Sequence, residues 1–336
     1  MPRRRPSRLT PLSRLVVCLW VLFLAMPAAQ SREPPRVVVS VKPVHDLVMG
    51  VTRGISEPAL LVPGGASPHD HALRPSGMRS LQEAHVVIWV GPELENFLVR
   101  PLSGLPAEVQ RITLLHDAGL VTYPVREGGI WDAHDHDHGH GHDHGHDGVH
   151  RHDHDPAHGN DHGEPDAHAW LSPENARRIV RHVAEKLAER DPGNADVYQD
   201  NLENMLKRLD RLEQDLAQRL EPVRERPFIV FHDAYQYFER HFGLTPAGSI
   251  TVDPSRAPGA RRVQEIRQRL AEADALCVFS EPQFRPGIVA TVTEGTRART
   301  GTLDPLGADL PSGPEGYEQL LRNLADSLVE CLGREG

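Results

Sequence analysis

The sequence is poor in aromatic residues and in basic character. Phenylalanine, tryptophan and tyrosine make up 5% of its 336 residues, and no basic stretch has aromatic side chains interleaved with it. The formal net charge is -10 with histidine counted as neutral. Because nucleic-acid binding needs a positively charged surface, a nucleic-acid partner is not expected.

Apolar runs long enough to cross a bilayer comfortably are also missing. The run Leu15 to Met26 is too short for this, but it follows a cluster of arginines and precedes small residues. That order is typical of a secretory signal, so we expect residues 1–31 to be a signal peptide cleaved after Ala29 or Ser31. The mature protein is then expected in the periplasm, with a retained anchor as the alternative.

Cysteine is scarce, and only Cys277 and Cys331 remain once the signal is removed. Because secreted proteins enter an oxidising compartment, we expect these two to form a disulfide. Two free, buried thiols are the alternative. Metal ligation by the pair is less expected, since neither cysteine has a cysteine or histidine partner close by in the sequence.

Short apolar runs alternate with longer amphipathic ones along most of the chain, as in buried parallel strands connected by helices. Strands are expected at 37–41, 59–62, 86–90, 112–115, 228–231, 275–279 and 298–303. This pattern predicts an α/β fold with two lobes, residues 36–192 and 223–336. Each lobe should have a central, mainly parallel sheet flanked by helices.

One long helix is expected to join the lobes over residues 193–222. Its leucines recur every three or four positions, and about 28 helical residues would span roughly 40 Å. A connector of this kind is rigid. We therefore expect the lobes to tilt modestly relative to each other rather than to close widely.

Histidine is the residue in excess, with 21 copies. Imidazole is a common ligand for transition metals, so the excess indicates metal handling. Twelve of them lie in one segment: His134, His136, His138, His140, His142, His144, His146, His150, His152, His154, His158 and His162. Residues 128–165 hold too few apolar side chains to fold, so we expect a disordered loop that binds metal weakly; a solvated insert is the alternative.

Three other histidines and one aspartate lie singly, close to the ends of predicted strands or helices. His232 follows one predicted strand, Asp304 follows another, and His69 lies in the loop after Val62. His168 precedes the next helix. Because ligands bind beyond the carboxyl ends of parallel strands, these four side chains are expected to converge between the lobes. Any one of them alone would more often be a surface residue.

Six segments in order closely resemble those of the zinc-specific substrate-binding proteins of bacterial ABC transporters. The resemblance covers essentially all of residues 37–332. The segments are Gly65-Ala66-Ser67-Pro68-His69-Asp70, Trp89-Val90-Gly91-Pro92-Glu93-Leu94-Glu95, His168-Ala169-Trp170-Leu171-Ser172-Pro173-Glu174, Phe231-His232-Asp233-Ala234-Tyr235, Ser280-Glu281-Pro282-Gln283-Phe284 and Gly301-Thr302-Leu303-Asp304-Pro305-Leu306-Gly307.

The resemblance implies that His69, His168 and His232 ligate Zn2+ and that Asp304 lies at the fourth position, a donor set that suits tetrahedral zinc. Some members have an acid before the first ligand, where this chain has Pro68. The fourth position could therefore belong instead to water or to a histidine of the loop. The resemblance also places a disulfide at the two cysteines.

A zinc-capturing component of this kind delivers its metal to an inner-membrane permease driven by an ATPase subunit. We expect a monomer without catalytic residues that can also meet other periplasmic zinc proteins. A manganese or iron importer component of the same fold is one alternative. A zinc hydrolase, with Glu281 or Asp70 as general base, is another, and a zinc buffer or adhesin is a third.

Overall fold

The computed structural model describes residues 33–126, 163–251, 254, 258–272, 277–285 and 287–334. The predicted signal peptide, residues 1–31, and the twelve histidines between positions 134 and 162 lie outside these ranges. The predictions made for both segments therefore stay predictions.

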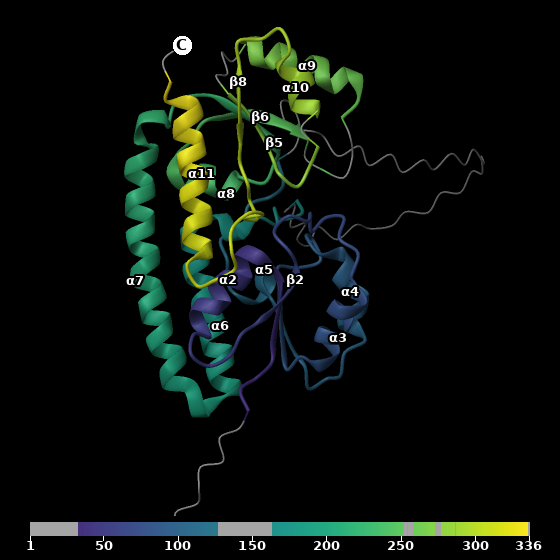
Figure 1. Ribbon diagram of the computed structural model, residues 1–336, viewed down its shortest axis with the longest axis vertical. Helices are drawn as coiled ribbons and strands as arrows, with labels where there is room; N and C mark the ends of the chain where they lie inside the picture. The colour runs from purple at the N-terminus through teal and green to yellow at the C-terminus, as the bar shows by residue number, and fades with distance from the viewer. Residues whose placement is uncertain are drawn as a thin grey trace, which may run out of the picture. The chain divides into compact units, whose positions relative to one another are not determined.

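Two four-stranded parallel sheets form the frame of the described chain (Figure 1). The first has the order β2-β1-β3-β4 and the second the order β6-β5-β7-β8. The strands are β1 (Val37–Val41), β2 (Ala59–Val62), β3 (Val86–Trp89), β4 (Gln110–Thr113), β5 (Phe228–His232), β6 (Pro246–Thr251), β7 (Cys277–Ser280) and β8 (Arg299–Thr302). The predicted fold class is confirmed.

Helices cover both sheets. They are α2 (Lys42–Val51), α3 (Pro75–Glu83), α4 (Asn96–Ser103), α5 (Leu114–Asp117), α6 (Pro173–Arg190), α7 (Ala195–Leu220), α8 (Gln236–Phe242), α9 (Ala260–Glu272), α10 (Gly287–Thr293) and α11 (Gly316–Leu332). Helix α6 begins as its sequence indicates, because the Ser172 hydroxyl accepts a hydrogen bond from the Asn175 N–H and Pro173 occupies the first turn.

The long connecting helix predicted from the leucine spacing is α7, with 26 residues. At 1.5 Å per residue it is about 39 Å long. Its buried side chains form one face, and it packs against α6 and α11, which lie beside it in Figure 1. The helix is thus a packed part of the core as well as a connector.

Each sheet buries its two faces in different cores. Val39 of β1 and Val230 of β5 point into one central core, which also contains the leucines of α7 and α11. The alternate residues Val38 and Ile229 point into separate outer cores, one for each lobe. Strand alternation therefore joins the lobes through one continuous apolar interior.

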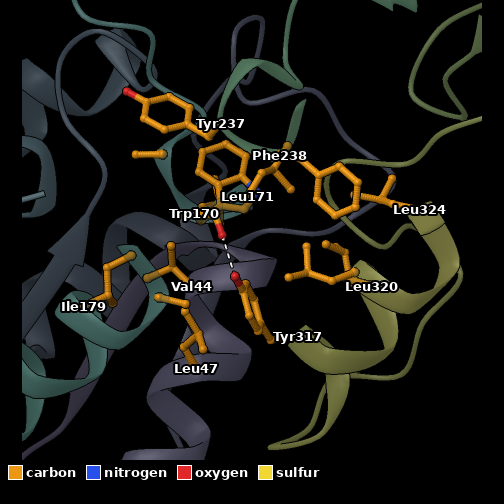
Figure 2. Close-up of a cluster of buried hydrophobic side chains, with 14 of the residues drawn as sticks. Val44, Leu47, Trp170, Leu171, Ile179, Tyr237, Phe238, Tyr317, Leu320 and Leu324 are labelled. Carbon is orange, nitrogen blue, oxygen red and sulfur yellow. Dashed lines mark hydrogen bonds between the residues drawn. The ribbon is translucent and has the colours of Figure 1, made fainter. Parts of the chain in front are cut away.

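Figure 2 shows the part of the central core where α2, α6, α8 and α11 meet. The Tyr317 hydroxyl of α11 donates to the Trp170 carbonyl at 2.7 Å, and the Trp170 indole N–H donates to the Pro305 carbonyl at 3.0 Å. The Tyr317 hydroxyl and the Trp170 indole N–H therefore each have a hydrogen-bond partner in the other lobe. These bonds fix the segment beyond β8 against the turn that follows His168.

Cys277 of β7 and Cys331 of α11 form the expected disulfide, with their Cα atoms 6.2 Å apart. It ties the last helix to the second sheet. Within the described ranges, no helix combines the length and the apolar character needed to cross a membrane.

Candidate metal centre

Three imidazoles from distant parts of the chain converge between the two sheets. His69 lies in the loop between β2 and α3, His168 precedes the short 3-10 turn Ala169–Leu171, and His232 is the last residue of β5. One ring nitrogen of each lies within 4.8 Å of the others. His168 and His232 are buried, whereas His69 is half-buried.

The spacing fits a tetrahedral ion. The Nε2 atoms of His69 and His168 are 3.4 Å apart. Two nitrogens at the usual zinc distance and at a tetrahedral angle would be about 3.3 Å apart. The ring centroids of the three histidines lie 4.8 to 5.5 Å from one another. The His69–His168 pair thus has the spacing of two ligands of one zinc ion, and His232 lies close enough to be the third.

A carboxylate fixes the orientation of the second imidazole. The Asp166 Oδ1 atom lies 2.7 Å from the Nδ1 of His168 and also accepts the backbone N–H of His168 at 3.0 Å. Gln236 donates to the other carboxylate oxygen at 3.3 Å. A proton shared with Asp166 belongs on Nδ1, which leaves the Nε2 lone pair for a metal.

Glu281 lies behind the third imidazole. Its Oε2 atom is 3.6 Å from the Nδ1 of His232, and the side chain is almost fully buried. Burial raises the pKa of Glu281 to about 8, against the opposing influence of His168. Glu281 thus lies near the His232 ring, at a longer distance than the 2.7 Å that separates Asp166 from His168.

Asp304 is not part of the group of three. Its Oδ1 accepts hydrogen bonds from the backbone N–H groups of Leu306 and Gly307 and from the side chain of Gln283, at 2.8 to 3.0 Å. Its Oδ2 accepts the Ala308 N–H at 2.5 Å. The carboxylate therefore organises the turn after β8, and its role as fourth ligand stays a prediction.

The space beside the imidazoles is a small cavity of about 10 Å³. This is room for roughly one water molecule or one bare ion. Besides the three histidines, the cavity is lined by Ser67, Pro68, Trp170, Glu281, Gln283, Phe284, Pro305 and Leu306.

A buried cluster of charges lies beside His232. The Arg126 guanidinium pairs with the Asp233 carboxylate through two nitrogens and lies 2.8 Å from the Glu239 carboxylate of α8. Burial raises the pKa of Glu239 to about 7, although Arg126 opposes this. The Asp233 carboxylate is thus held by Arg126.

Sequence reasoning did not single out Arg126 or Gln283. Gln283 lies in one of the six resembling segments, but the partners that Arg126 and Gln283 bind in the other lobe are 107 and 219 residues away. His71, two residues after His69, packs against Phe97 with ring centroids 5.1 Å apart and does not join the group of three histidines.

Comparison with known proteins identifies the family of this chain. The family model described as zinc-uptake complex component A, periplasmic, matches residues 37–331. A high-affinity zinc uptake system protein of Brucella suis is 47% identical over 321 residues, covering 93% of this chain and 95% of that protein. The corresponding protein of Yersinia pestis is 40% identical over 304 residues, covering 88% of this chain and 91% of that protein.

A solved structure gives the same result for the fold. The crystal structure of ZnuA matches with a TM-score of 0.72 at 26% identity, covering 89% of this chain and 99% of that one. The family model covers nearly all of the chain from β1 to the end of α11. The chain therefore belongs to the family of periplasmic A components of zinc-uptake complexes.

Proposed function

We propose that this protein captures Zn(II) with His69, His168 and His232 and delivers it to a membrane permease driven by an ATPase. The observation that carries this proposal is the convergence of three ring nitrogens within 4.8 Å. Membership of a zinc-uptake family supports the choice of metal and the transport role. Export by residues 1–31 would place the protein in the periplasm.

For the fourth position we retain Asp304, with water or a histidine of the 134–162 segment as the other donors. A carboxylate offers about four lone pairs, two on each oxygen. Because three hydrogen-bond donors approach Oδ1 and one approaches Oδ2, Oδ2 is the atom with capacity left for a metal. Ligation through Oδ2 would leave the turn after β8 intact.

Metal analysis combined with calorimetry on the mature chain tests the site. The parent should bind one zinc ion tightly, and His69→Ala should lose that equivalent. His116→Ala is the matched control, because His116 pairs with Glu93 at 2.8 Å and lies outside the group of three. Equal tight binding by the parent and His69→Ala would refute the assignment, and tighter manganese than zinc binding would favour a manganese importer.

We further propose that the histidine-rich segment collects zinc near the site. Deleting residues 134–162 should remove the weak equivalents of bound zinc and leave the tight one. Loss of the tight equivalent on deletion would contradict this and would favour a loop histidine as the fourth ligand.

A further inference from the structure

Gln283 bridges the two lobes at the wall of the metal cavity. It follows β7 in the second lobe, and its side-chain nitrogen donates to the Gly64 carbonyl of the first lobe at 2.9 Å. The same nitrogen donates to the Asp304 Oδ1 at 2.8 Å. One amide group thus holds the loop that carries His69 against the turn that follows β8.

The orientation of this amide is determined by its neighbours. A backbone carbonyl and a carboxylate oxygen only accept hydrogen bonds, so the NH2 group, with two N–H donors, must face them. The amide oxygen of Gln283 is buried and has no donor among the described residues. The nitrogen is therefore the half of the side chain that links the lobes.

Gly64 lies against the second lobe with no space to spare. A Cβ atom added there would be 2.8 Å from the Gly307 carbonyl oxygen and 3.0 Å from that of Leu306. Contacts this short between an added Cβ atom and backbone oxygens cannot be relieved by turning a side chain. The seam between the lobes is consequently closed by backbone contact, and the Gln283 bridge lies across it.

His69 is the imidazole that this seam controls. It follows Gly64 by five residues, and its backbone N–H donates to the Ser67 hydroxyl at 3.3 Å. It is also the most exposed of the three imidazoles, whereas His168 and His232 are buried. The cavity of about 10 Å³ has room for one bound ion, so movement of the His69 loop would change the access of that ion to solvent.

We propose that Gln283 is a positioning residue that sets how fast zinc enters and leaves the site. Its bond to Gly64 keeps the His69 imidazole close enough to His168 and His232 for all three rings to bind one ion. When that bond breaks, the His69 loop moves away from the second lobe and the ion is released. The inference rests on zinc binding by the three histidines, so tight binding by the parent protein is measured first.

Gln283→Glu is the sharpest test, because it keeps the size of the side chain and replaces the donating nitrogen with an acceptor. That oxygen would face both the Gly64 carbonyl and the Asp304 carboxylate. We expect zinc transfer to a fluorescent chelator, followed by stopped flow on the full mature chain, to be at least about tenfold faster. Gln319→Glu is the control, since Gln319 is exposed on α11 and its side-chain nitrogen donates to Asn323 on the same helix.

Gly64→Ala changes the same seam on the side of the first lobe. It should also accelerate zinc release, because the added methyl group forces the two backbones apart. The Co(II) absorption spectrum of both variants should change, as the coordination geometry relaxes. A role in folding alone would lower the melting temperature of the metal-free protein and leave the release rate unchanged. Release within twofold of the parent in Gln283→Glu overturns the proposal; if that variant does not fold, Gly64→Ala decides by the same criterion.

Discussion

Replacing Asp166 by asparagine should weaken zinc binding without dismantling the site. An asparagine oxygen at the Oδ1 position can still accept both hydrogen bonds from His168, so the ring keeps its orientation. What disappears is the negative charge 2.7 Å from Nδ1, which makes the imidazole a better donor to the metal.

The size of the effect follows from the kind of bond lost. A hydrogen bond to a charged group contributes roughly 1.5–3 kcal/mol and a neutral one about 1 kcal/mol. The difference, about 0.5–2 kcal/mol, corresponds to a roughly 2- to 30-fold weaker zinc affinity. The new amide nitrogen would also face the Gln236 side-chain nitrogen, but the Gln236 oxygen has no partner among the described residues, so the amide can turn at the expense of its bond to Pro124.

Competition with a chelator at fixed pH and ionic strength measures this affinity. Glu164→Gln is the matched control. Glu164 is exposed and lies two residues before Asp166, and the change removes the same negative charge. Unchanged affinity in Asp166→Asn would refute the supporting role of the carboxylate. An equal loss in Glu164→Gln would show that long-range charge, and not the bond to His168, is responsible.

Three further predictions concern pH and covalent structure. Zinc affinity should fall below about pH 6.5, where free imidazoles take up protons, and calorimetry showing undiminished binding at pH 5 would contradict the three-histidine site. Burial raises the pKa of Glu95 from its ordinary 4.5 to about 7, so its contribution to the stability of the metal-free protein is complete below pH 4.5 and is lost as the pH rises through 7. Urea titrations should therefore show a fall on the order of 3 kcal/mol over this range that is missing in Glu95→Gln. Replacing both disulfide cysteines by serine opens a bridge with a sequence separation of 54 residues. This should lower the free energy of unfolding by about 4 kcal/mol, and a loss below 1 kcal/mol would refute the loop-entropy estimate.

The sequence was informative wherever local pattern decides structure. The β-branched run of β1 and the leucine spacing of α7 predict those elements, because buried strands and amphipathic helices impose such patterns. Strand β6 was not predicted: its residues Pro246–Thr251 include one large apolar side chain, and the strand forms by pairing with β5. Helix α8 was also not predicted, since its seven residues are too few to show a helical period.

The same distinction between local pattern and tertiary contact applies to the candidate site. His69, His168 and His232 could be placed because each lies in a recognisable segment near the end of a structural element. The polar residues that support them could not, since the bonds of Gln283 to Gly64 and of Arg126 to Asp233 depend on how the lobes meet. Asp304 shows the limit most clearly: its segment was recognised, but the four hydrogen bonds that occupy its carboxylate are visible only in three dimensions.

The continuous interior beneath the two sheets has a thermodynamic consequence. Because Val39 and Val230 belong to the same apolar core as the leucines of α7, neither lobe can lose its structure while the other keeps its full complement of buried surface. The lobes should therefore melt in one cooperative transition. A metal ion held at their seam then stabilises the whole protein at once, by about 4.1 kcal/mol at a free concentration one thousand times the dissociation constant. Loading with the ion thus protects the carrier itself against unfolding and proteolysis.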